Sequence, residues 1–203
     1  MSLFRKYFTR TSEKNGAIQV YKDMFGPWEV SVDDCGQTTS YTYAMWVNAF
    51  KRLRTQLPKN NVKKVLMLGL GAGGQIGTIN KTFPHCTLTA VEYDKEMVQL
   101  AHETQLYKPF PFPHVLLGDA KDVVPTIQDS FDLIILDLFA GPEPSPLGHD
   151  EQFIGQLRER LTPKGLLLIN VYQRAEYLET AKRLFTNSSL WQFRLNNLGA
   201  FWQ

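Results

Sequence analysis

The residues whose types and spacing could do chemistry begin with a glycine-rich loop. Within six positions directly after the apolar run 65–68 stand four glycines: Gly69, Gly71, Gly73 and Gly74. Three of them match G-x-G-x-x-G, a pattern that permits a tight turn and lets backbone N–H groups approach a ligand closely. A helix beginning near Gln75 would direct the positive end of its dipole at that ligand. Alone, the loop is a weak signal, because a glycine-rich turn without a ligand has the same sequence.

Carboxylates follow each of the next three predicted strands. Glu92 ends the second strand, 21 residues after Gly71, where an acid can accept hydrogen bonds from ribose hydroxyls. Asp119 follows the third strand and is placed to accept from an adenine amino group. Asp137 ends the fourth strand and could take a proton from an amine. Each acid has a structural alternative, as a helix cap or an exposed strand end.

An alternation of strands and helices from Val62 onward must position these groups. Short apolar runs predict five strands, and the segments that follow them have apolar residues at helical spacing, which predicts helices. The strands are 65–68, 87–92, 114–117, 131–137 and 166–171. This order predicts an α/β fold with a doubly wound, mostly parallel, Rossmann-like sheet, which binds ligands outside the carboxyl ends of its strands. The proline-containing loop from Gly141 to Gly148 is a candidate lid, or alternatively a structural crossing.

The first 40 residues predict a small β-appendage. Residues 1–15 are polar with scattered aromatics and predict a loosely held arm, with an oligomer contact as the alternative. Alternating apolar residues and turn signals in 16–40 predict a β-hairpin. The predicted domains are therefore an arm and β-hairpin appendage at 1–40 and a Rossmann-like nucleoside-binding domain at 41–203.

The composition is typical of a globular protein in water. The chain has 203 residues, 43% of them hydrophobic, and a formal net charge of +2, which argues against a strong general affinity for nucleic acid. The four histidines show no metal-ligand spacing, so no metal site is predicted, and the two separated cysteines fit a reducing compartment. No apolar run approaches the ~20 residues of a membrane span, and the first residues lack the apolar core of a secretory signal. We expect a cytoplasmic protein with no membrane or nucleic-acid partner.

The order of these motifs resembles the class I S-adenosylmethionine-dependent transferases, and within them the spermidine synthase family. The resemblance covers about residues 16–171 and rests on the glycine loop, Val91-Glu92-Tyr93-Asp94, Gly118-Asp119-Ala120 and the Asp137-Leu138-Phe139 loop. It implies these cofactor-binding residues: Gly69, Gly71, Gly73, Gly74, Glu92, Asp119 and Ala120. Asp137 is the implied catalytic base, and the candidate substrate-binding residues are Gln37, Tyr41 and Glu143.

The resemblance also implies a reaction. The cofactor would be S-adenosylmethionine or decarboxylated S-adenosylmethionine, leaving S-adenosylhomocysteine or methylthioadenosine, and a homodimer would transfer a methyl or aminopropyl group to a small amine acceptor. Aminopropyltransferases carry acids where this chain has Ala72 and Ala140. Without these two carboxylates a polycationic acceptor is attracted less, which argues against ordinary spermidine synthesis. Glu143 is a candidate replacement carboxylate.

Two other functions stay open at this point. One is a non-catalytic relative that binds the nucleoside and acts as a sensor or partner protein. The other is a nicotinamide-dependent dehydrogenase, which the glycine loop and Glu92 alone would allow. Gly118-Asp119-Ala120 and the Asp137 loop argue against the dehydrogenase.

Overall fold

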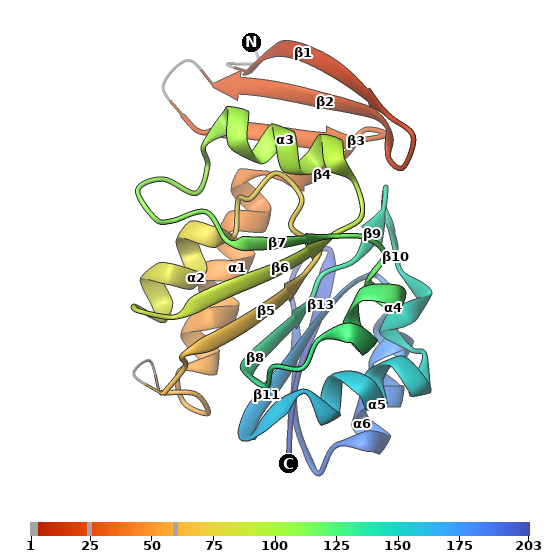
Figure 1. The fold of residues 1–203 in the computed structure, drawn as a ribbon. Coiled ribbons are helices and arrows are strands. Elements are labelled where there is room, and N and C mark those ends of the chain that lie inside the picture. Colours follow the sequence, from red (N-terminus) through yellow and green to blue (C-terminus); the bar gives the residue numbers. More distant parts are fainter. Residues whose placement is uncertain (1–3, 24–25, 59–60) are drawn as a thin grey trace.

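A seven-stranded sheet forms the centre of the computed structural model, which describes residues 4–23, 26–58 and 61–203 (Figure 1). The strand order is β12-β13-β11-β8-β5-β6-β7. The five strands from β11 to β7 are parallel, and the last two join antiparallel at the β11 edge. The strands are β5 (Lys64–Leu68), β6 (Thr87–Glu92), β7 (His114–Leu117), β8 (Phe131–Leu136), β11 (Leu161–Tyr172), β12 (Asn187–Gln192) and β13 (Asn196–Trp202). The predicted doubly wound, mostly parallel α/β sheet is confirmed.

Helices cover both faces of this sheet. Successive side chains of β5 alternate between two apolar clusters, because side chains of a strand point to opposite faces in turn. Val65 and Met67 join a cluster that contains residues of α1, α2 and α3, whereas Leu66 and Leu68 join one that contains residues of α4, α5 and α6. The helices are α1 (Ser40–Leu53), α2 (Ile76–Thr82), α3 (Lys95–Thr104), α4 (Ala120–Val123), α5 (Glu151–Glu159) and α6 (Leu178–Leu184).

Side-chain caps set the starts of four helices, α1, α3, α4 and α5. Thr39 and Thr42 form a capping box at the start of α1. Asp94 accepts from the backbone N–H of Glu96 at the start of α3, and Asp150 caps α5 in the same way. Because Asp94 caps α3, this helix begins three residues after the end of β6.

The N-terminal region is a four-stranded antiparallel sheet, where the sequence suggested an arm and a hairpin. Its strands are β1 (Phe4–Ser12), β2 (Gly16–Asp23), β3 (Trp28–Val32) and β4 (Cys35–Thr38). The loosely held arm is therefore wrong for residues 4–12, which pair with β2, while residues 1–3 lie outside the described chain. This sheet packs on α3 and on the glycine loop through an apolar cluster: Ile18, Val20, Val30, Val32, Ala72, Met97 and Leu100.

Two segments that contain proline and glycine have regular structure. The segment 141–148 contributes to a short hairpin of β9 (Phe139–Ala140) and β10 (Glu143–Pro144), followed by a 3₁₀ turn at Pro146–Gly148. Residues 162–165, with a proline and a glycine, lie inside β11, whose pairing with β8 shifts register between Leu161 and Leu166. None of the described helices has the length and apolar character needed to cross a bilayer.

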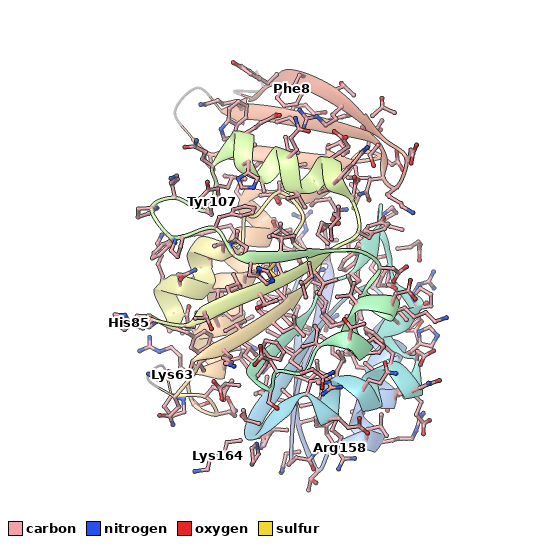
Figure 2. The ribbon with its side chains drawn as sticks, viewed as in Figure 1. Phe8, Lys63, His85, Tyr107, Arg158 and Lys164 are labelled. Carbon is pink, nitrogen blue, oxygen red and sulfur yellow. The ribbon has the colours of Figure 1, made fainter. Side chains whose placement is uncertain are left out.

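The carboxyl ends of the parallel strands point toward the N-terminal sheet. Lys63 and Lys164, near the starts of β5 and β11, lie at the end of the molecule opposite Phe8 of β1 (Figure 2). The glycine loop, the ends of β6 and β8 and the β9–β10 hairpin therefore lie between the central sheet and the N-terminal sheet (Figure 1).

Candidate functional site

The glycine loop joins β5 to α2 in a conformation that needs glycine. Gly69, Gly71 and Gly73 have φ of +94°, +52° and +79°. A Cβ at Gly69 would lie 2.2 Å from the backbone oxygen of Asp137, so the loop passes directly against the end of β8. A Cβ at Gly71 would meet no atom within 4 Å, because this part of the loop borders a cavity. Gly74 instead packs against Thr38 of β4.

Glu92 is held at the end of β6 by four backbone N–H groups. Its Oε2 accepts from Leu70 at 3.0 Å and from Gly71 at 2.9 Å, and its Oε1 accepts from Tyr93 and Asp94, both at 3.0 Å. Burial raises the pKa of the carboxyl group, and the backbone hydrogen bonds act in the opposite direction. The acid thus fixes the glycine loop against β6, a role that its spacing did not indicate.

Asp119 occupies the end of β7 and is exposed. Its Oδ1 accepts from the N–H of Lys121 at 2.9 Å, so it caps the short helix α4, and Ala120 beside it is buried. Asp119 and Ala120 line a cavity of about 220 Å³ together with Tyr93 and the β9–β10 hairpin. Asp119 therefore caps a helix, as the structural alternative predicted, and also lies beside a cavity.

Asp137 lies at the end of β8, partly open to a cavity. Its Oδ1 accepts from Nδ2 of Asn170 at 2.7 Å, and its Oδ2 accepts from Nε2 of Gln75. Burial raises the pKa of Asp137 to about 6, with both hydrogen bonds lowering it in part. At pH 7 the group is ionised yet more basic than an ordinary aspartate, as a general base requires.

Two buried asparagines behind Asp137 were not anticipated. Asn170 on β11 and Asn196 on β13 are each 6% exposed, and Nδ2 of Asn196 donates to Oδ1 of Asn170 at 3.0 Å. The hydroxyl of Tyr41 donates to Oδ1 of Asn196 at 3.1 Å. A polar residue near the end of the apolar run 166–171 was the available signal for Asn170, because that strand end lies beside Asp137.

Three cavities run along the carboxyl edge of the sheet. The cavity beside Asp119 is followed by a small one of about 50 Å³ bordered by Gly71, Glu92 and Asp137. A third, of about 390 Å³, opens beyond Asp137 and lies against β4, α1 and β13. Phe139 lines all three, so the cavities form one row across the strand ends. We call the third one the acceptor cavity.

The candidate substrate-binding residues divide between these cavities. Gln37 and Tyr41 line the acceptor cavity, and Nε2 of Gln37 also donates to the backbone oxygen of Gly141 at 2.9 Å, which ties β4 to the hairpin tip. Glu143 lies elsewhere: it lines the cavity beside Asp119 and pairs with Arg174 at 3.2 Å. The structure therefore does not bring Glu143 to Asp137.

Ala72, the departure that counted most against polyamine chemistry, also lies elsewhere. It is fully buried in the apolar cluster beneath the N-terminal sheet, and it lines none of the three cavities. Ala140 is exposed on β9 and borders the cavity beside Asp119. Among the described residues, no three side chains of His, Cys, Asp or Glu are grouped so that they could hold a metal ion.

Comparison with known proteins identifies the family of this arrangement. The model of the methyltransferase small domain family matches residues 47–194, which include the glycine loop and all three strand-end acids. The chain belongs to this family. Its fold is that of a spermidine synthase-like class I methyltransferase, as the motifs predicted. A probable spermidine synthase from Corynebacterium glutamicum superposes with a TM-score of 0.75 at 19% identity, over 98% of this chain and 80% of that one.

Other similar proteins are named for methyl transfer or for aminopropyl transfer. Human methyltransferase-like protein 13, solved with SAH, superposes with a TM-score of 0.60 at 19% identity, over 80% of each chain. An eEF1A lysine and N-terminal methyltransferase homolog from Drosophila melanogaster is 31% identical over 137 residues. A probable polyamine aminopropyl transferase from Bifidobacterium longum is 25% identical over 148 residues. The alignment covers 62% of this chain and 20% of the Drosophila melanogaster relative, and it covers 73% of this chain and 31% of the Bifidobacterium longum relative. The chain therefore spans only a small part of either relative's length.

Proposed function

We propose that this protein transfers an alkyl group, methyl or aminopropyl, from S-adenosylmethionine or its decarboxylated form to a small amine. Membership of the methyltransferase small domain family supports alkyl transfer in general. The relatives' names cover lysine, N-terminal and polyamine acceptors, all of which are amines. The observation that carries the proposal is the position of Asp137, a carboxylate of raised pKa that lines both the small cavity beside Glu92 and the acceptor cavity.

The residues along the row of cavities fit a thioether nucleoside. The absence of a side chain at Gly71 lets a ligand approach the backbone, because a Cβ there would project into free space beside the cavity. Glu92 and Asp119 would accept from the ribose hydroxyls and the adenine amino group. Such a cofactor supplies a sulfonium, whose attached carbon an amine can attack. Alignment of the two reactants then accounts for most of the rate increase.

Asp137 is the group that would take the proton of the attacking amine. At pH 7 its carboxylate is available because the pKa of about 6 lies below that pH. As the pH falls through about 6 the carboxylate becomes protonated, so activity falls on the acidic side. Gln37 on β4 and Tyr41 on α1 would contact the acceptor, since both line the acceptor cavity.

The charges around the acceptor cavity argue for a small amine over a polyamine. Among the described residues, the charged side chains that line it are Asp34, Asp137 and Arg194. Asp34 and Arg194 are both exposed and of opposite charge, so together they add no net charge to the cavity. Since Glu143 lines another cavity, the only further carboxylate that lines the acceptor cavity among the described residues is the exposed Asp34. Ordinary spermidine synthesis is therefore expected to be weak.

Calorimetry followed by turnover assays tests the proposal. S-adenosylmethionine, its decarboxylated form, methylthioadenosine and NAD are titrated separately, and turnover is then measured on a panel of monoamines and diamines. We expect binding of a thioether nucleoside, turnover on an amine, and loss of turnover in Asp137→Asn but not in the surface control Asp129→Asn. Binding of NAD alone would refute the proposal. Nucleoside binding without turnover on any amine would instead support the non-catalytic sensor or partner protein.

Three finer expectations belong to the same proposal. A homodimer follows from the resemblance, whereas the cytoplasmic location and the division into an arm and β-hairpin appendage at 1–40 and a transferase domain at 41–203 follow from the sequence patterns, and all three stay predictions. Sedimentation of the purified protein tests the first, and expression of residues 41–203 alone tests the third. A fragment that folds and binds the nucleoside would support the division, although the contact of the N-terminal sheet with α3 predicts that it is destabilised.

A further inference from the structure

The two oxygens of Asp137 differ in how firmly their hydrogen-bond partners are fixed. Oδ1 accepts from Asn170, which belongs to a chain of hydrogen bonds reaching back to the protein backbone. The N–H of Leu195 donates to the hydroxyl oxygen of Tyr41 at 3.0 Å, and that hydroxyl donates to Oδ1 of Asn196 at 3.1 Å. Asn196 in turn donates to Oδ1 of Asn170 at 3.0 Å. Every bond in the chain therefore points toward Asp137.

The direction of this chain is set at its far end. A backbone N–H can only donate, whereas a hydroxyl can donate or accept and a carboxamide can turn either its oxygen or its NH₂ to a neighbour. Tyr41 accepts from Leu195 and donates its one proton to Asn196, so turning Asn170 away from Oδ1 of Asp137 would require Asn196 and the Tyr41 hydroxyl to turn with it. Turning Asn170 or Asn196 would leave polar atoms of a 6% exposed side chain unpaired, which is costly.

The partner of the other oxygen is free to turn. Gln75 donates to Oδ2 through Nε2, while its own Oε1 is buried with no hydrogen-bond partner among the described residues. Rotating this carboxamide by half a turn breaks no bond except the one to Asp137. After rotation, Oε1 would face Oδ2 and could accept a hydrogen bond from it.

We infer that Asp137 takes up its proton on Oδ2, and that Gln75 changes from donor to acceptor as the proton arrives. The N–H bond of the acceptor amine breaks, the O–H bond forms at Oδ2, and the electron pair of that N–H bond stays on the nitrogen. Oδ1 cannot carry the proton without losing its bond from Asn170, because the tied amide has no oxygen to offer. This assignment rests on the proposed role of Asp137 as the base.

The chain behind Oδ1 holds Asp137 in place but does not carry protons away. Asparagine amides neither release nor bind protons near neutral pH, so Tyr41 is a positioning residue in this chain. The other titratable or charged groups around the two cavities at Asp137 are Glu92, Tyr93, Asp34, Cys35, Tyr172 and Arg194. Of the described residues, only Asn170 and Gln75 hydrogen-bond its carboxyl group, which makes them the residues to vary.

Titration of the Asp137 carboxyl group by ¹³C NMR tests the assignment without any substrate. Its resonance is identified by its absence in Asp137→Asn. Asn170→Leu removes a donor that binds the ionised carboxylate more strongly than the carbonyl oxygen of the protonated form, so the pKa of Asp137 should rise by about one pH unit. Gln75→Met removes a donor to the ionised form but also the oxygen that would accept from Oδ2–H in the protonated form, so the rise should be less than half as large. An equal or larger rise in Gln75→Met would overturn the inference.

Two variants further along the chain keep the test decisive if Asn170→Leu does not fold. Asn196→Leu frees Asn170 to turn, and Tyr41→Phe, at a less buried position, frees Asn196. Both should raise the pKa of Asp137, and an unchanged pKa in both would contradict the inference. A purely structural role would lower the melting temperature without moving the titration. Failure to bind any thioether nucleoside would refute the proposed function but leave this result standing.

Discussion

Replacing Asp137 by asparagine should stabilise the protein while abolishing transfer. Burial raises the pKa of Asp137 from 3.8 to about 6, so the folded state disfavours the ionised form. With ~1.4 kcal/mol for each pH unit, the ionised carboxylate costs about 3 kcal/mol at pH 7 and above. This is an upper limit, because part of the residue remains open to the cavity. Asparagine has nearly the same shape and no charge to bury.

The hydrogen bonds of Asp137 survive this exchange. The new amide oxygen can accept from Asn170, and the new NH₂ group can donate to Oε1 of Gln75 once that carboxamide turns. The turned NH₂ group of Gln75 then lies where Oε1 had no partner, so the gain should stay below the ionisation penalty, at about 1–2 kcal/mol.

The pH dependence identifies the cause. A carboxyl group whose pKa is raised by folding binds its proton more tightly when folded, so the penalty is full above about pH 6 and vanishes below the unfolded pKa of about 4. Urea unfolding at pH 8 and pH 4.5 should show Asp137→Asn gaining over the wild type mainly at pH 8. Asp129→Asn, at an exposed ion pair with Lys64, should change stability by less than about 1 kcal/mol. A stability difference that does not vary with pH would refute the reasoning.

Four further changes have expected outcomes. Gly69→Ala places a Cβ 2.2 Å from a backbone oxygen and should unfold the protein at lower urea, whereas Gly71→Ala has free space and should lose only about 1–2 kcal/mol from its positive φ. Glu92→Gln puts an NH₂ group against backbone donors and should weaken nucleoside binding at least tenfold by calorimetry, an expectation that unchanged affinity would sink. Gln37→Ala removes the bond to the hairpin tip and should speed amide hydrogen exchange in β9 and β10; equal exchange would show that the bond does not hold the hairpin. Arg194→Glu should raise kcat/KM for diamines relative to monoamines, and an unchanged ratio would remove Arg194 from the specificity argument.

The strand ends were predictable because two independent patterns coincide there. Short apolar runs predicted five parallel strands, and a glycine or an acid directly follows four of them, so Gly69, Glu92, Asp119 and Asp137 were brought to one edge by topology alone. Their hydrogen bonds were not predictable in the same way. Two of the four backbone N–H groups that Glu92 accepts come from the glycine loop, which turns back over it in a geometry that depends on backbone angles and not on spacing.

The partners of Asp137 were missed for a different reason. Asn170 lies in the otherwise apolar run 166–171 of β11, and Asn196 begins the antiparallel strand β13, so no local pattern connects them. They meet because β13 pairs with β11 at the sheet edge, and Asn196 is the registered neighbour of Tyr172. The hairpin at 139–144 was missed because its two-residue strands are too short to show periodicity.

The position of Ala72 changes the argument about polyamines. A missing carboxylate at this position matters to the acceptor only if the side chain faces the site. In this protein the Ala72 methyl group is fully buried among Ile18, Val20 and Met97, where an aspartate would be desolvated without a hydrogen-bond partner of its own. The identity of residue 72 is thus constrained by the packing of the N-terminal sheet on the glycine loop. A polycationic acceptor is disfavoured instead because Glu143 lines the cavity beside Asp119, and because the exposed Asp34 and Arg194 leave Asp137 as the one carboxylate lining the acceptor cavity that is not exposed, among the described residues.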